Sequence, residues 1–259
     1  MKVGAKAAFE AVTGWVFPNA CQLCGDRRAT AADGYVCPQC WTGLRFIQPP
    51  TCRRCGLPFS GAITHEFECA NCRDLDLAFD FARAAVVADG VALEVIHRYK
   101  YQRALWFEPF LGDLLRRATG PDFKPGDWDG IVPVPLHPVR EREREFNQAE
   151  RLGEILGRAF NLPIFPRLVC RTEATRTQTR LTRDERAENV RRAFAPAPAA
   201  RLPGRRFLVV DDVLTTGATT DAVARVLREL GAETVGVLTA ARATLEGTVL
   251  PTGPPGAGH

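Results

Sequence analysis

The sequence predicts an α/β fold, a parallel sheet with helices on both faces, preceded by a small cysteine-rich module. From residue 81 onward, short β-branched runs alternate with amphipathic segments of helical period, which is typical of parallel βαβ units. Eight of the nine cysteines lie between residues 21 and 72, in four C-x-x-C pairs. We therefore expect an N-terminal helix over 1–18, the cysteine-rich module over 19–74, the α/β domain over 75–245 and a disordered tail over 246–259.

The composition is that of an ordinary folded protein. The 259 residues are 46% hydrophobic and carry 34 Lys and Arg against 30 Asp and Glu, a net charge of +4. This excess is too small to indicate nucleic-acid binding by itself. The apolar runs are far shorter than the roughly 20 residues that a membrane span needs. Glu10 also interrupts the run that would otherwise suggest a signal peptide. We expect no membrane span and a cytoplasmic location.

The paired cysteines predict two structural zinc sites. The two pairs within each half are separated by 12 and 13 residues, which suits a zinc ribbon, because each C-x-x-C turn lets two thiolates hold one tetrahedral ion. A disulfide framework is the alternative, but no secretion signal supports it. In the simplest arrangement, two consecutive pairs share one ion. In an interleaved arrangement, alternate pairs share an ion, and the same eight residues are used. The predicted ligands are Cys21, Cys24, Cys37, Cys40, Cys52, Cys55, Cys69 and Cys72.

The sequence FLVVDDVLTTGATT, residues 207–220, combines a buried strand with a turn suited to phosphate. We expect a strand over 207–210, with Asp211 and Asp212 facing solvent at its carboxyl end, where open α/β sheets bind ligands. The next residues offer backbone N–H groups, hydroxyls and little bulk at the start of a helix, a combination that suits a phosphate group. These residues are Thr215, Thr216, Gly217, Ala218 and Thr219.

Two other classes of protein carry acids at the end of a strand. A P-loop NTPase would need G-x-x-x-x-G-K-[ST], which is absent from the sequence, and a receiver domain would carry its acid pair near the start of the domain. A ribose-phosphate site is therefore the favoured interpretation. A helix over 220–230, stopped by Gly231, and a strand over 234–238 are expected to follow.

Two segments in the middle of the chain place cations near the ends of elements. A strand over 81–87 leads into a helix that ends near Lys100. A strand over 131–134 stops in a proline-rich turn, where a ligand would lie, and Arg140 and Arg142 follow before a long amphipathic helix. The alternative for both segments is a solvated surface, paired with neighbouring acids or stabilised by the helix dipole.

A third segment, residues 171–194, holds seven arginines against four acids. It follows a short strand over 168–170 and has little apolar periodicity, so we expect much of it to be a mobile loop. A mobile basic loop can close over a polyanion and exclude water.

Several motifs together resemble the ComF-type competence proteins, in which a double zinc ribbon precedes a type I phosphoribosyltransferase domain. They are the four cysteine pairs, VPVPLHPVREREREFNQAE, the series Q-x-x-L-x-x-x-x-R-x-x-N-V-x-x-A-F and VVDDVLTTGATT, and they span nearly the whole chain. The resemblance implies that Asp211 and Asp212 are catalytic residues that hold the ribose hydroxyls of phosphoribosyl pyrophosphate (PRPP). It implies that residues 215–219 hold the 5′-phosphate of PRPP.

The resemblance also suggests how the rest of PRPP would be bound. Residues 172–189 would form a flexible hood. Glu145 departs from the family pattern, because relatives commonly have glycine there and a glutamate adopts positive φ only at a cost. The pyrophosphate would be bound by residues from the proline-rich turn and by nearby cations, namely Val134, Pro135, Leu136, Arg140, Arg142 and Lys100.

Two functions are consistent with this resemblance. In the first, the protein is a phosphoribosyltransferase that binds PRPP and Mg²⁺ and transfers the phosphoribosyl group to an acceptor that the sequence does not identify. In the second, it is a non-catalytic adaptor in DNA uptake and natural transformation, whose zinc ribbons and basic loop hold single-stranded DNA or a competence helicase. The basic loop lacks interleaved aromatic residues that would stack on bases, which counts against the second function.

Overall fold

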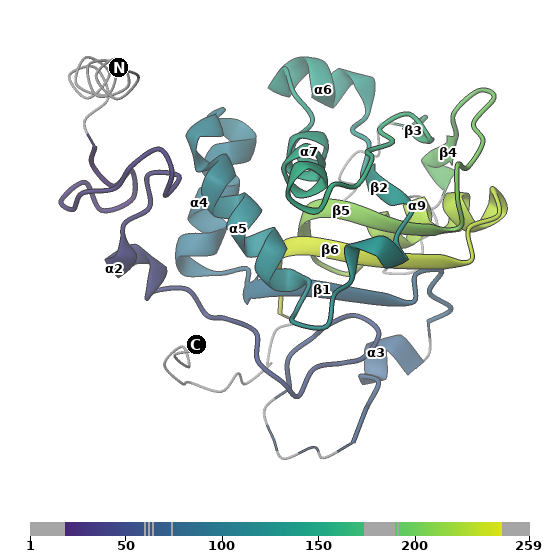
Figure 1. Cartoon of the computed structure of the whole chain (residues 1–259), viewed down its shortest axis with the longest axis horizontal. Coiled ribbons are helices and arrows are strands. Elements are labelled where there is room, and N and C mark those ends of the chain that lie inside the picture. The colour runs from purple at the N-terminus through teal and green to yellow at the C-terminus, as the bar shows by residue number, and fades with distance from the viewer. Residues whose placement is uncertain are drawn as a thin grey trace, which may run out of the picture.

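The computed structural model of the protein describes residues 19–59, 61, 63, 65–73, 75–173, 190 and 192–244 (Figure 1). The predicted N-terminal helix, the predicted tail and most of the predicted basic loop lie outside the described residues. None of the described helices has the length and apolar character that crossing a bilayer needs.

A four-stranded parallel sheet forms the centre of the protein (Figure 1). The strands lie in the order β1-β6-β5-β2, so the two longest strands occupy the middle. Residues 207–210 are completely buried there, as expected for a parallel strand covered on both faces. The strands are β1 (Phe81–Val87), β2 (Gly130–Pro133), β5 (Arg206–Leu214) and β6 (Thr234–Arg242).

Helices cover both faces of this sheet, which confirms the predicted fold class. Successive residues of β5 alternate between two cores, because side chains on a strand point to opposite faces. Leu208 and Val210 belong to the core that includes α4, α5 and α7, whereas Phe207 and Val209 belong to the core that includes α9. These helices are α4 (Gly90–Tyr101), α5 (Glu108–Ala118), α7 (Gln148–Phe160) and α9 (Ala218–Glu229).

Several predicted boundaries need correction at the carboxyl ends of the central strands. The strand predicted over 81–87 is β1, without change. In contrast, β5 continues through both aspartates to Leu214, and β6 continues to Arg242, because the two strands remain paired to their ends. The apolar runs therefore predicted strands that are shorter than β5 and β6. The helix that follows β5 begins at Ala218, two residues earlier than predicted, and Gly231 follows its last turn with φ +106°.

Shorter elements connect the layers. An antiparallel hairpin, β3 (Val169–Arg171) and β4 (Phe194–Pro196), packs beside α9 and flanks the predicted basic loop. The strand predicted over 168–170 thus lies one residue further along the chain. The remaining elements are the helices α2 (Pro38–Trp41), α3 (Ala70–Arg73) and α6 (Pro138–Arg144), and the 3₁₀ helices η1 (Leu105–Phe107) and η2 (Pro125–Asp127).

The segment between the two cysteine-containing modules, and the second module itself, attach to the free edge of β1. Between them, the N–H of Ile47 donates to Ala85 O at 2.8 Å, and the N–H of Val87 donates to Arg45 O at 2.9 Å. In the second module, Arg54 O accepts the N–H of Ala82 at 2.6 Å. These bonds occupy backbone groups that an edge strand would otherwise expose. The modules are therefore fixed to the sheet that carries the candidate ligand site.

Candidate functional site

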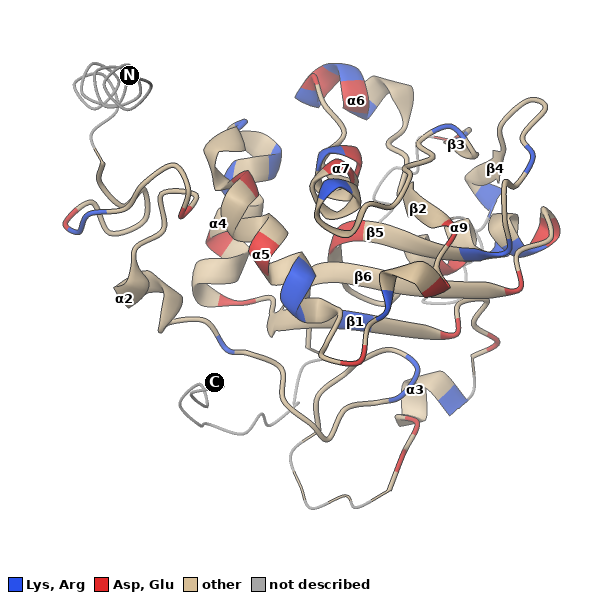
Figure 2. Ribbon diagram, viewed as in Figure 1, with Lys and Arg blue, Asp and Glu red and all other residues tan. Residues whose placement is uncertain are grey.

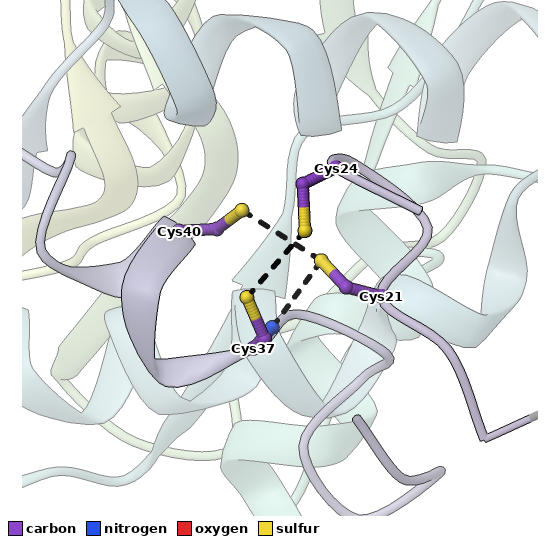
Figure 3. A group of neighbouring side chains, drawn as sticks. All are labelled: Cys21, Cys24, Cys37 and Cys40. Carbon is purple, nitrogen blue, oxygen red and sulfur yellow. Dashed lines mark hydrogen bonds between the residues drawn. The ribbon is translucent and has the colours of Figure 1, made fainter. Parts of the chain in front are cut away.

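The eight predicted zinc ligands form two clusters of four cysteines, and in each cluster the four sulfur atoms lie within 4.8 Å of one another. Figure 3 shows the first cluster, where Cys24 Sγ and Cys37 Sγ are 3.8 Å apart and Cys21 Sγ and Cys40 Sγ are 3.7 Å apart. Sulfurs bound to tetrahedral zinc at about 2.3 Å would be about 3.8 Å apart. The second cluster comprises Cys52, Cys55, Cys69 and Cys72. Consecutive pairs thus share each site, and the interleaved arrangement does not occur.

The backbone supports thiolates in both clusters. The N–H of Cys37 donates to Cys21 Sγ at 3.4 Å, and the N–H of Cys69 donates to Cys52 Sγ at 3.3 Å. Burial opposes ionisation of Cys21, but backbone N–H groups, first that of Cys24, lower the pKa of its thiol to about 6. Burial and then the charge of Cys55 raise the pKa of Cys69 to about 11. A divalent cation would allow all four sulfurs of a cluster to bind as thiolates. The donor sets fit two structural zinc sites.

The predicted pair of aspartates lies inside β5 and does not face solvent after its end. Asp212 is almost completely buried, with 2% of its side chain exposed, and its Oδ2 lies 2.5 Å from Lys100 Nζ at the end of α4. The prediction that both carboxylates face solvent is therefore wrong for Asp212. The error has a physical cause: Lys100 supplies a counter-charge that permits a carboxylate to be buried.

Asp211 is half-buried and has no such direct partner among the described ion pairs. Its Oδ1 accepts the N–H of Asp212 at 2.9 Å. Burial, and then the charge of Asp212, raises the pKa of the Asp211 carboxyl well above its ordinary value, and the ammonium of Lys100 offsets part of this rise. The unliganded site thus favours additional hydrogen-bond donors or cations beside Asp211.

The predicted phosphate loop follows β5 directly and leads into α9. Thr215 and Thr216 are exposed, and Thr216 Oγ1 accepts the N–H of Ala218 at 3.4 Å. Gly217 is the N-cap of α9 with φ +85°, a left-handed conformation that a side chain would strain. Thr219 lies half-buried in the first turn. The five predicted residues thus form one turn at a helix N-terminus, where unpaired N–H groups favour an anion.

The proline-rich turn lies beside the aspartates. The N–H of Val134 donates to Val210 O at 3.0 Å, one residue before Asp211. Asn147 Nδ2 donates to Val134 O at 3.2 Å, and the side-chain oxygen of Asn147 caps α7 by accepting the N–H of Ala149 at 3.0 Å. Pro135 is buried and Leu136 is half-buried. The turn is therefore held between β5 and the start of α7.

Of the predicted arginines, Arg140 interacts with Arg171 on β3, a residue that also interacts with Asp211. Burial, and then the charge of Arg140, lowers the pKa of Arg171 on β3, and Asp211 opposes this effect. Arg140 and Asp211 are therefore each close enough to Arg171 to interact with it. Arg142 is exposed and two residues along from Arg140, so their side chains leave different sides of α6, a helix of alternating charge in Figure 2. Arg171 was not predicted as a site residue. Its position at the end of a short strand was the signal in the sequence that could have indicated it.

Glu145 adopts the conformation that the family's glycine would favour. It ends α6 with φ +64°, in the left-handed region. Its carboxylate lies 2.6 Å from Arg103 Nη1, and both side chains are more than half exposed. An exposed ion pair of this kind contributes little to stability, so the turn keeps its shape at a cost in backbone strain.

Comparisons with known proteins agree with both parts of the chain. A model of the double zinc ribbon domain matches residues 12–73, and a model of the phosphoribosyl transferase domain matches residues 157–251. Competence protein F of Haemophilus influenzae is 31% identical over 231 residues, which cover 86% of this chain and 96% of that protein.

Two further relatives share most of their length with this chain. DNA utilization protein YhgH of Escherichia coli strain K12 is 34% identical over 233 residues, 85% of this chain and 95% of the relative. Competence protein ComFC of Bacillus subtilis is 30% identical over 202 residues, 77% of this chain and 80% of the relative.

Proposed function

The chain belongs to the family of Competence protein F, the ComF-type competence proteins, and on this premise we propose that it binds PRPP with Mg²⁺ at the carboxyl edge of its sheet. One observation carries the proposal: Asp211 and Asp212, the latter paired with Lys100, lie near the end of β5, which leads directly into the glycine-capped N-terminus of α9. We assign residues 19–74 to a zinc module with a structural role and residues 75–245 to the PRPP-binding domain.

The aspartates suit the ribose of PRPP. Two adjacent hydroxyl groups need hydrogen-bond acceptors, and a carboxylate accepts without donating. The raised pKa of Asp211 means that its charge is poorly compensated in the unliganded protein. Hydroxyl donors would compensate it, while Lys100 holds Asp212 in place at 2.5 Å. The 5′-phosphate would then lie on the turn over 215–219, at the start of α9.

The pyrophosphate of PRPP suits Arg140 and Arg171, two cations that lie close to each other. Burial, and then repulsion by Arg140, lowers the pKa of Arg171. A diphosphate between them would convert this repulsion into attraction on both sides. Bound Mg²⁺ would neutralise part of the diphosphate charge, since it prefers phosphate and carboxylate oxygens. These residues would stabilise pyrophosphate as it leaves the anomeric carbon.

We propose that the ligand site serves DNA uptake, as the names of two relatives, Competence protein F and Competence protein ComFC, suggest for those proteins. If PRPP does not bind, the alternative is a non-catalytic adaptor that holds single-stranded DNA or a helicase. A filter-binding assay with single-stranded DNA over a salt titration tests that alternative, because direct phosphate contacts weaken steeply with salt.

Isothermal titration calorimetry with PRPP and Mg²⁺ tests the proposal. The zinc-loaded protein is compared with the double variant Asp211→Asn, Asp212→Asn, and with Asp113→Asn, which removes a carboxylate that pairs with Arg116 and Arg117 on α5. We expect saturable binding by the wild type and by the control, and no measurable binding by the double variant. Equal binding by all three proteins would refute the assignment of the aspartates.

A further inference from the structure

Arg242, the last residue of β6, joins the second cysteine cluster to the phosphate loop. Its exposed fraction is only 5%. In the parallel pairing of β5 and β6, it lies opposite Leu214, the last residue of β5. Its side chain therefore lies where the strand ends and the phosphate loop begins.

The guanidinium of Arg242 contacts both regions at once. Its Nη1 donates to Leu214 O at 3.2 Å and to Thr215 O at 2.5 Å, and it also donates to Ala243 O at 2.5 Å. On the other side, its Nε donates to Cys55 O at 3.2 Å, and its Nη2 lies 3.7 Å from Cys55 Sγ. One side chain thus holds a cysteine of the second cluster and two carbonyls at the start of the phosphate loop.

The contacts on the loop side determine where its N–H groups point. In a trans peptide, the C=O and the N–H of the same peptide unit point in opposite directions. Because the carbonyls of Leu214 and Thr215 point toward Arg242, the N–H groups of Thr215 and Thr216 point away from it. Both are residues proposed to bind the 5′-phosphate. Arg242 therefore orients two donors of the loop without touching the ligand itself.

The contacts on the cysteine side supply a counter-charge for the buried arginine. Among the residues that the structure describes, its partners are carbonyl oxygens and a sulfur, and none is a carboxylate. A buried cation without a compensating charge is costly. Four thiolates around one zinc ion carry a net negative charge, so a filled second cluster would provide that compensation beside Cys55.

We propose that Arg242 is a positioning residue that couples the second zinc site to binding of a 5′-phosphate. This inference rests on the proposed PRPP site. Zinc fixes Cys55, Cys55 fixes the guanidinium, and the guanidinium fixes the carbonyls of Leu214 and Thr215. Because coupling between two binding sites is reciprocal in free energy, a phosphate ligand tightens zinc binding at the second site, and loss of that zinc weakens phosphate binding.

The first cysteine cluster provides an internal control. Its contacts with the α/β domain lie on α4 and α5, away from the phosphate loop: Arg98 Nη1 donates to Gln22 O at 2.6 Å, and the ring of Trp41 lies 4.7 Å from that of Phe110. Zinc in the first site is therefore expected to be insensitive to a phosphate ligand. The two sites of one molecule should respond differently.

Release of zinc to a chromophoric chelator tests the coupling, with ribose 5-phosphate as the probe and ribose as its control. Alkylation of freed thiols, mapped by mass spectrometry, assigns each phase of release to one cluster. In the wild type, we expect ribose 5-phosphate to slow release from the second site about fivefold or more and to leave the first site unchanged. Equal release rates with and without the probe, at saturation, would overturn the coupling.

Arg242→Lys is the informative variant, because it keeps the charge but loses the fork that reaches several acceptors at once. We expect it to bind two zinc ions, to release the second faster, and to bind ribose 5-phosphate about tenfold more weakly. Arg205→Lys, an exposed arginine at the amino end of the sheet, serves as the control and should match the wild type.

The outcomes distinguish this inference from the proposed function. If Arg242→Lys fails to fold, the effect of ribose 5-phosphate on the two release phases of the wild type still decides the question. If the wild type binds the probe and Arg242→Lys behaves like the wild type in both assays, the coupling is wrong and the PRPP site stands. If calorimetry detects no binding of the probe or of PRPP to the wild type, both are overturned.

Discussion

Two adjacent carboxylates of this protein should affect its stability with opposite signs. Asp212 is buried against Lys100, with side-chain exposures of 2% and 16%, so Asp212→Asn leaves a mostly buried ammonium without its partner. Asp211 has a raised pKa, caused first by burial and then by Asp212, so Asp211→Asn removes a charge that the fold disfavours. Asparagine keeps the side-chain oxygen that accepts the N–H of Asp212.

The magnitudes follow from these environments. Removing one partner of a buried ion pair typically costs 3–5 kcal/mol, and the residual exposure of Lys100 places the loss for Asp212→Asn at about 3 kcal/mol. Relieving the disfavoured charge of Asp211 should stabilise the unliganded protein by about 1 kcal/mol, at the expense of ligand binding. In a domain of this size, 1 kcal/mol shifts Tm by roughly 3 °C, so we expect a fall of about 9 °C for Asp212→Asn and a rise of about 3 °C for Asp211→Asn.

The two variants also differ in pH dependence. Because the folded pKa of Asp211 lies above its unfolded value, its contribution to stability is fully present below the unfolded pKa and is lost as pH rises through the folded pKa. The gain from Asp211→Asn should therefore be largest at neutral pH and shrink as pH falls toward about 4.

Scanning calorimetry of the zinc-loaded, unliganded proteins at pH 7 and pH 5 measures both effects. Asp113→Asn, a surface carboxylate on α5, is the control and should change Tm little. A fall in Tm for Asp211→Asn comparable with that of Asp212→Asn, or no change for Asp212→Asn, would show that the buried ion pair does not organise the site as described.

Three further predictions concern the turn after α6, the zinc sites and the cations. Glu145→Gly relieves a left-handed conformation with φ +64° and should raise the free energy of unfolding by about 1 kcal/mol in urea denaturation, because the exposed pair with Arg103 contributes little; a decrease would mean that the ion pair outweighs the strain. The purified protein should hold two zinc ions per chain by atomic absorption, and Cys24→Ser should reduce this to one, whereas an unchanged count would exclude the first cluster as a zinc site. Arg171→Gln should weaken PRPP binding about tenfold in calorimetry, since Arg171 interacts with Asp211, and Arg142→Gln, on the exposed side of α6, should change it little; equal losses would contradict this arrangement of the pyrophosphate site.

The sequence predicted the elements whose signals are local. The run over 81–87 is bounded by turns and became β1 unchanged. The cysteine pairs indicated two metal sites because the ligand spacing is itself local, although only the fold decided that consecutive pairs share each site. Gly217 and the small residues around it indicated a helix N-terminus, which is where they lie.

The features that sequence reasoning missed depend on contacts between distant residues. β5 extends through a charged pair because Lys100, far away in the sequence, compensates Asp212. Arg171 and Arg140 come together only because the β3–β4 hairpin folds back beside the sheet. Arg242 ends an apolar strand and gave no signal of its own, since its partners belong to a cysteine module and to the loop after a neighbouring strand.

The most direct measurement is an experimental structure of the protein with PRPP and Mg²⁺. We predict one PRPP molecule per chain, with its ribose hydroxyls on Asp211 and Asp212, its 5′-phosphate on the N–H groups at the start of α9, and its pyrophosphate beside Arg140 and Arg171. PRPP bound elsewhere, or an empty carboxyl edge at a saturating concentration, would contradict the central claim.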